Sequence, residues 1–201
     1  MRMDERGFDE DFSALDAARW RLDTHALGRG MVRAENVLVA GGSASLVLPA
    51  GGRDGGELRT ADRFGHGTYA ARMRTPLAPG SVSAFFLYQG GSDVADELDI
   101  EIPNDRSRTV MFTTWVGGVQ TNTVTLPLPF DPAAGDHEYR IQWRAGEVRF
   151  AVDGVEMQRW MEGVPGQPMY VMANAWWPKW MSGPELSEAR PLRILYIRAE
   201  P

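Results

Sequence analysis

Three carboxylates alternate with two apolar residues in the segment Glu97-Leu98-Asp99-Ile100-Glu101. In a β-strand, successive side chains point to opposite faces of the sheet, so Glu97, Asp99 and Glu101 would share one face. Leu98 and Ile100 would then point into a core. A row of like charges repels itself and has little structural use, but it suits an enzyme that cleaves a bond between two sugars.

The spacing of the two glutamates fits such a reaction. Strand geometry puts the Cα atoms of Glu97 and Glu101 about 13 Å apart, and a concave strand face would bring their carboxyl groups toward the roughly 5–5.5 Å of a retaining glycosidase. Crowding should raise the pKa of at least one carboxyl, which keeps a proton available for the acid step. The alternative is an acidic, solvated strand without chemistry, and the pentapeptide alone does not separate the two.

The composition is that of an ordinary globular protein and excludes several other classes. The chain has 201 residues, 43% of them hydrophobic, and a net charge of −6 without a run of Lys or Arg, which argues against nucleic acid as a partner. It has no cysteine, and its three histidines lack the spacing of metal ligands. No apolar run is long enough to span a membrane, so we expect no membrane partner.

The chain consists of short apolar stretches separated by Gly, Pro, Asp and Asn. We predict strands at 32–39, 43–48, 67–75, 81–88, 96–102, 108–115, 120–126, 137–144, 147–152, 169–177 and 192–198. Asp153-Gly154, between two apolar stretches, predicts a hairpin turn. Regularly spaced strands without helical periodicity, linkers or internal repeats predict a single all-β domain over residues 1–201, built as a two-sheet sandwich or jelly roll.

The acidic strand belongs to a longer, ordered set of motifs. Asp96-Glu97-Leu98-Asp99-Ile100-Glu101 has the pattern D-E-x-D-x-E with aliphatic residues at x. The other segments, in chain order, are 56–59 (GELR), 65–69 (GHGTY), 83–88 (SAFFLY), 137–143 (HEYRIQW), 152–154 (VDG) and 172–176 (MANAW). This set covers nearly the whole chain and resembles glycoside hydrolase family 16, and within it most closely the bacterial lichenases (endo-β-1,3-1,4-glucanases).

The resemblance implies a fold, an activity and a set of site residues. The fold would be a curved two-sheet β-jelly-roll sandwich (concanavalin A-like) with a concave substrate cleft. Glu97 would be the nucleophile, Glu101 the acid/base and Asp99 the assisting carboxylate. The substrate-binding residues would be Glu57, Arg59, Tyr88, Trp115, Asn174 and Trp176. The activity would be internal cleavage of a β-linked polysaccharide, most directly a β-1,3-1,4- or β-1,3-glucan, by double displacement without a cofactor.

Three positions depart from the lichenase pattern. Ala95 stands where those enzymes carry Trp, Ile102-Pro103-Asn104 replaces Phe-Leu-Gly, and Thr113 replaces Asn. The chemistry is left intact, but the glycan is then open to a galactan, laminarin or a bacterial exopolysaccharide. Transglycosylation would use the same residues, and a non-catalytic glycan-binding jelly roll is a further alternative. An aliphatic residue replaces the Asp of the calcium site that many lichenases carry near the C-terminus, so we expect no metal.

Strand parity separates the aromatic residues near the C-terminus. Trp176 shares parity with Asn174 and should face the cleft, whereas Trp177 should face the core. Glu57 and Arg59 also share a strand face, and the alternative to cleft residues is a surface ion pair between them. The methionines at 157, 161, 169 and 172 are expected to fill the core.

Residues 1–10 lack the apolar core of a signal peptide. We expect either an extracellular protein whose signal is not part of this chain or a cytoplasmic one, and a monomer in both cases.

Overall fold

The computed structural model describes residues 6–91 and 94–201, and over these residues the regular elements are strands and one short 3-10 helix. The elements are β1 (Phe8–Glu10), β2 (Trp20–Arg21), β3 (His25–Leu27), β4 (Gly30–Val32), η1 (Ala34–Asn36), β5 (Val37–Val39), β6 (Ala44–Leu48), β7 (Gly56–Thr60), β8 (Gly67–Arg74), β9 (Val82–Tyr88), β10 (Glu97–Pro103), β11 (Thr109–Val116), β12 (Val119–Pro127), β13 (His137–Arg144), β14 (Glu147–Val152), β15 (Val155–Trp160), β16 (Tyr170–Trp176) and β17 (Arg190–Glu200). The N-terminal segment 1–10, which we judged to lack a signal peptide, lies partly outside the described residues. Among the described residues, no helix is long and apolar enough to cross a membrane.

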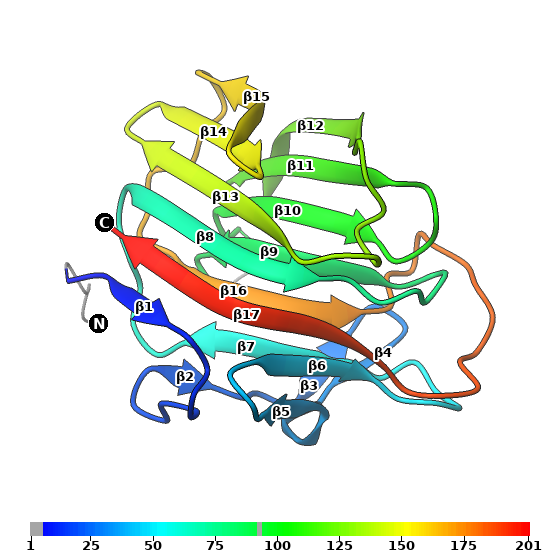
Figure 1. Cartoon of the computed structure of the whole chain (residues 1–201). Helices are drawn as coiled ribbons and strands as arrows, with labels where there is room; N and C mark the ends of the chain where they lie inside the picture. The colour runs from blue at the N-terminus through cyan, green and yellow to red at the C-terminus, as the bar shows by residue number, and fades with distance from the viewer. Residues whose placement is uncertain (1–5, 92–93) are drawn as a thin grey trace.

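Within the described ranges, two large antiparallel sheets lie face to face, and β3 and β4 form a separate ribbon (Figure 1). The first sheet has the order β15-β14-β13-β8-β17-β6-β5, with β1 beside β17. The second has the order β12-β11-β10-β9-β16-β7-β2. In each sheet, one strand from near the C-terminus is inserted between two N-terminal strands: β17 lies between β6 and β8, and β16 lies between β7 and β9. This arrangement confirms the predicted all-β sandwich.

The space between the sheets is one apolar core. On β10, Leu98 and Ile100 are fully buried, as strand alternation predicts. Phe112 of β11 stacks on Phe150 of β14 with ring centroids 4.9 Å apart, so aromatic rings join the two sheets directly. Each fully buried aliphatic or aromatic side chain stabilises the fold by about 1.5–3 kcal/mol. Strand β10 is thus anchored in the core by its apolar face, and its acidic face points outward.

Most predicted strands occur within two residues of the expected bounds, and the predicted hairpin is confirmed. Asp153 and Gly154 connect β14 to β15 with φ angles of 48° and 79°, the left-handed pair that a tight hairpin turn requires. The predicted strand 32–39 is wrong over residues 33–36 and confirmed over Val37–Val39, which form β5. The chain leaves β4 at Val32 and makes one 3-10 turn, in which the backbone N–H of Asn36 donates to the Arg33 carbonyl.

Six strands lie outside the predicted ranges or touch them at one residue only: β1, β2, β3, β4, β7 and β15. Of these, β7 was anticipated only by the shared strand face of Glu57 and Arg59. Five of the six have five residues or fewer, and the sixth, β15, follows the predicted hairpin turn. Periodicity is weak over so few residues. Two of the missed strands, β3 and β7, carry side chains of the site described next.

Candidate active site

The outward face of the second sheet carries the site, and strand register sets its residues in rows. The first row across β16, β9, β10 and β11 is Tyr170, Tyr88, Glu97 and Trp115. The second row, which begins on β7, is Arg59, Met172, Phe86, Asp99 and Thr113. The third row is Glu57, Asn174, Ala84, Glu101 and Met111. The three acids of β10 therefore share one side of the sheet with the polar residues of β7 and β16.

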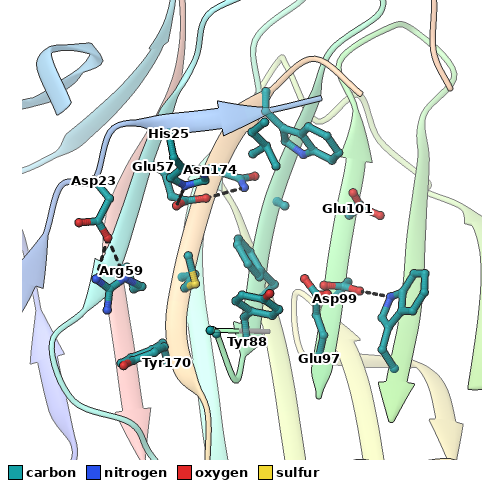
Figure 2. Close-up of a pocket in the computed structure, with 18 of the residues that line it drawn as sticks. Asp23, His25, Glu57, Arg59, Tyr88, Glu97, Asp99, Glu101, Tyr170 and Asn174 are labelled. Carbon is teal, nitrogen blue, oxygen red and sulfur yellow. Dashed lines mark hydrogen bonds and ion pairs between the residues drawn. The ribbon is translucent and has the colours of Figure 1, made fainter. Parts of the chain in front are cut away.

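A cleft of about 720 Å³ lies over these rows (Figure 2). All nine residues predicted for the site line it: Glu57, Arg59, Tyr88, Glu97, Asp99, Glu101, Trp115, Asn174 and Trp176. The lining comes from β3, β7, β9, β10, β11 and β16 and from the loops around them. The cleft thus crosses the strands, as a site for an extended chain of sugars would.

Asp96, the first acid of the motif, is not in the cleft and fixes the start of β10. Its buried carboxylate accepts the backbone N–H groups of Gly117 (2.9 Å), Gly166 (3.3 Å) and Gln167 (3.2 Å). These donors belong to two separate loops. Hydrogen bonds to a charged acceptor are among the stronger ones in proteins, so Asp96 ties both loops to the strand next to Glu97.

Asn104 fixes the other end of the strand. The Ser83 hydroxyl donates to Asn104 Oδ1 at 2.8 Å, and Asn104 Nδ2 donates to Ser81 Oγ at 2.9 Å. Ile102 is fully buried. The sequence Ile102-Pro103-Asn104, which departs from the family pattern, therefore acts on the anchoring of β10 and not on the lining of the cleft.

The three carboxyl groups strongly affect one another's ionisation. Burial raises the pKa of Glu97 to about 7. A hydrogen bond with Asp99 opposes this rise, and the nearby charge of Glu57 adds to it. Burial and then the charge of Glu97 raise the pKa of Glu101 to about 7. Burial, followed by the charges of both glutamates, raises the pKa of Asp99 well above its ordinary value. At least one raised pKa was predicted from crowding; the directions agree, but burial is the largest cause and the neighbouring charges come second.

Asp99 is the most enclosed of the three acids. Its carboxyl group is hydrogen-bonded to the carboxyl of Glu97 and accepts the indole N–H of Trp115 at 3.1 Å (Figure 2). A protonated Asp99 can donate to Glu97 while its other oxygen accepts from Trp115. In this state, the proton is on Asp99, and Glu97 is held in one orientation as an ionised acceptor.

Glu57 is the centre of a second polar cluster, on the opposite side of the cleft. It is buried and accepts from His25 Nε2 at 3.0 Å and from Asn174 Nδ2 at 3.1 Å. The other ring nitrogen of His25 lies 3.1 Å from the carbonyl oxygen of Ala26, so both nitrogens face acceptors and both carry protons. The hydrogen bond to Glu57 is the main reason that the pKa of His25 rises to about 9.

Arg59 does not pair with Glu57, so the surface ion pair that we considered between them does not form. Its guanidinium instead binds Asp23, with Nε at 2.8 Å and Nη2 at 2.7 Å from the same carboxylate oxygen. Arg59 also lies over the ring of Tyr170, 4.7 Å from its centroid. Glu57 and Arg59 thus occupy neighbouring rows with separate partners.

The two consecutive tryptophans diverge as parity predicts. Trp176 lines the cleft, whereas Trp177 is fully buried and donates its indole N–H to the Asp54 carbonyl at 3.1 Å. Gly28 has a φ of 62°, and a Cβ there would stand 2.2 Å from the Trp177 carbonyl oxygen and 2.9 Å from ring carbons of Trp176. A glycine is therefore needed where this loop packs against the end of β16.

Sequence reasoning missed several cleft residues and misplaced others. Asp23, His25, Arg63, Phe86, Tyr170 and Trp180 line the cleft without having been predicted. Met172 was expected in the core but lines the cleft, and Met161 is 63% exposed. Tyr170 and Met172 share strand parity with Asn174, so the argument used for Trp176 would have found both. His25 lies in the three-residue strand β3 and Asp23 in the loop before it, and neither segment has a periodicity that would indicate a cleft residue.

Across the described ranges, no group of three or more His, Cys, Asp or Glu side chains is arranged to hold a metal ion.

Comparison with known proteins gives a consistent picture. The family model described as glycosyl hydrolases family 16 matches residues 29–186. A β-glucanase of Acetivibrio thermocellus is 33% identical over 175 residues, which are 82% of this chain and 52% of that protein. The chain thus spans about half the length of curated relatives that it matches.

Solved structures match over their whole length. The Bacillus licheniformis β-glucanase superimposes with a TM-score of 0.90 and 25% identity, and the match covers 97% of this chain and 98% of that one. A β-1,3-1,4-glucanase (lichenase) from a mouse hindgut metagenome gives a TM-score of 0.86 and 27% identity, with 97% and 99% covered.

Proposed function

Because the chain belongs to glycosyl hydrolase family 16, we propose that it is an endo-acting, retaining hydrolase of β-glucan with β-1,3-1,4 or β-1,3 linkages. The observation that carries the proposal is that Glu97, Asp99 and Glu101, successive outward residues of β10, all line the cleft with raised pKa values. The relatives named β-glucanase support the choice of glucan.

In the first step, Glu101 acts as the acid and Glu97 as the nucleophile. The pKa values of Glu97 and Glu101 are both raised to about 7, and a charge on Glu97 favours the protonated form of Glu101. In molecules with Glu97 ionised, Glu101 therefore still holds its proton and gives it to the glycosidic oxygen. The Glu97 carboxylate attacks the anomeric carbon as the bond to that oxygen breaks. The products of this step are a glycosyl ester on Glu97 and a free sugar chain with a new hydroxyl group.

In the second step, water hydrolyses the glycosyl ester with Glu101 as the base, and the free enzyme is restored. Glu101, now ionised, takes a proton from water, and the hydroxide attacks the anomeric carbon from the side that the first sugar chain left. The Glu97 carboxylate is released, and two inversions give net retention. Asp99 hydrogen-bonds to Glu97 in the free enzyme and supports it as the leaving carboxylate.

The Glu57 cluster is suited to hold a neighbouring sugar. Asn174 Oδ1 is buried and has no hydrogen-bond donor within residues 6–91 and 94–201, while the amide nitrogen of the same side chain is fixed on Glu57. A sugar hydroxyl can satisfy this oxygen. Trp176 and Tyr88, which also line the cleft, offer aromatic surfaces for the apolar faces of sugar rings.

We also propose that the protein works as a monomer and outside the cell. The cleft is built entirely from residues of one chain, so catalysis needs no second copy. A polymeric glucan does not cross a membrane, so an enzyme that cuts it internally is useful where the polymer lies.

Two variants test the mechanism. Glu97→Gln should lose turnover because an amide cannot attack the anomeric carbon. Glu101→Ala should be nearly inactive on glucan but active on an aryl glycoside with a good leaving group, and added azide should give the β-glycosyl azide. An α-azide, or substantial turnover by Glu97→Gln, would overturn the assignment of the two glutamates.

A panel of polymers tests the substrate. Mixed-linkage glucan, laminarin, galactan and exopolysaccharides are compared by the fall in viscosity and by mass analysis of products. Cleavage of galactan or exopolysaccharide with no cleavage of either glucan would refute the proposed substrate. A rapid fall in viscosity with few new chain ends is expected of endo action.

A further inference from the structure

One side of the cleft carries a cation that has no counterion. Three cationic side chains line this side: His25, Arg59 and Arg63. His25 binds Glu57, and Arg59 binds Asp23. Arg63 forms no ion pair or hydrogen bond with any residue in the ranges 6–91 and 94–201, and its buried Nε–H has no acceptor there. A buried, unpaired donor on a permanent cation calls for a ligand.

The backbone around Arg63 fixes its position. Phe64 and Met169 exchange both of their backbone hydrogen bonds, at 2.8 and 2.9 Å, and both side chains are buried in the core. Their neighbours Arg63 and Tyr170 therefore point to the other side, into the cleft. The Arg63 guanidinium lies over the Tyr170 ring, 4.8 Å from its centroid. Arg63 is thus a held residue and not a mobile surface side chain.

Tyr170 joins the two arginines into one donor surface. Arg59 lies 4.7 Å from the centroid of the same ring, and Figure 2 shows it between Asp23 and Tyr170. The donors of Arg59 that face Asp23 are already used. Arg63, by contrast, has no acidic partner in the described ranges, and its N–H groups are available to a bound molecule.

The distance from the reacting carboxylates defines which sugar Arg63 would meet. Tyr170 pairs with Tyr88, and Tyr88 pairs with Glu97, so Tyr170 lies two strands from the nucleophile. At 4.7–4.9 Å per strand, this is about 9.5 Å. A group bound by Arg63 therefore belongs to a neighbouring sugar in the chain and not to the sugar that reacts.

We propose that Arg63 binds a carboxylate carried by the substrate, so that the preferred substrate is a β-glucan whose chain carries carboxylate groups. The proposal rests on the proposed function, since it names the substrate class of the same cleft. A bound polysaccharide removes water from the unpaired guanidinium of Arg63. A neutral sugar has no negative charge to compensate for the lost hydration. A carboxylate has this charge, and its two oxygens match the planar fork of N–H donors on arginine.

The experiment compares one glucan in two forms. Mixed-linkage β-glucan is used unmodified and after oxidation of a fraction of its C6 hydroxymethyl groups to carboxylates. For the wild type and for Arg63→Gln, kcat/KM is measured on both forms in low salt. The oxidised-to-unmodified ratio should fall about tenfold in Arg63→Gln, the size expected for loss of a charge-assisted hydrogen bond. Arg63→Lys, which keeps the charge without the fork, should lose less, and added salt should reduce the wild-type ratio.

The outcomes separate this proposal from the proposed function. An equal loss on both forms, or no loss on either, would overturn the role of Arg63 while leaving glucan hydrolysis intact. If the wild type cleaves neither form, the proposed function fails. Calorimetric binding of the oxidised oligosaccharide to Glu97→Gln, with and without Arg63→Gln, then decides the carboxylate site on its own. Melting temperatures check that the Arg63 variants are folded.

Discussion

Replacing Glu101 with Gln should stabilise the protein at alkaline pH while it removes activity. The cost of ionising a carboxyl group in the cleft is visible in the pKa of Glu101, which burial and the charge of Glu97 raise from 4.5 to about 7. At about 1.4 kcal/mol for each pKa unit, the ionised group lowers the free energy of unfolding by up to about 3 kcal/mol. The side chain is only partly enclosed, so screening by water reduces this to about 1–2 kcal/mol.

The pH window follows from the direction of the pKa change. The folded protein holds the Glu101 proton more tightly than the unfolded chain does, so stability falls as the pH rises from about 4.5 to about 7. Above this window, the penalty is complete. Gln cannot ionise and escapes it. The variant and the wild type should therefore be about equally stable near pH 4.5 and differ most at pH 8.

Urea unfolding of both proteins at pH 4.5 and pH 8 measures the difference. A gain of 1–2 kcal/mol corresponds to about 2–8 °C in melting temperature for a protein of this size. Glu162→Gln is the matched control, because it makes the same substitution at an exposed position outside the cleft. Equal stability of Glu101→Gln and wild type at pH 8, or the same offset at both pH values, would refute the reasoning. A gain would show that the acid is kept for chemistry at the expense of stability.

Sequence reasoning located the acids of the site because they lie on one strand. Alternation over Glu97 to Glu101 places the acids on one face and Leu98 and Ile100 on the other, and the structure has this arrangement. The sandwich followed from regularly spaced short strands. Local periodicity is sufficient where a single strand carries both the pattern and the function.

The partners of those acids could not be derived in the same way. His25 reaches Glu57 across 32 positions, and Asn174 reaches it across 117, because β16 inserts between β7 and β9. Register between distant strands depends on the packing of the whole core and not on any one segment. Only the resemblance to a family suggested Glu57 and Asn174, and it did not suggest His25.

The positions that depart from the lichenase pattern act at different places. Asn104 holds the end of β10 through Ser81 and Ser83, so its difference concerns the support of the strand. Ala95 and Thr113 are both buried, and Thr113 shares a row with Asp99. Changes of substrate preference should therefore be sought first in residues that line the cleft, such as Arg63, which no family pattern brought to attention.

Four further variants probe the cleft and the core behind it. Asp99→Asn can still donate to Glu97 but cannot hold or release a proton, so kcat should fall with little change in melting temperature, and unchanged kcat would demote Asp99 to a structural residue. His25→Ala should reduce stability below pH 6.5 and lose its effect as the pH rises to about 9, because the pKa of His25 is raised by Glu57; a constant offset in urea midpoints from pH 6 to 9.5 would contradict this. Trp176→Ala should raise KM by the equivalent of about 1–3 kcal/mol with little change in melting temperature, since its ring faces the cleft and is covered only by ligand. Trp177→Ala should instead cost about 3–5 kcal/mol of stability, since the fully buried ring would leave a cavity in the core. If Trp176→Ala lost the stability and Trp177→Ala only the affinity, the assignment of one face of β16 to substrate and the other to the core would be wrong.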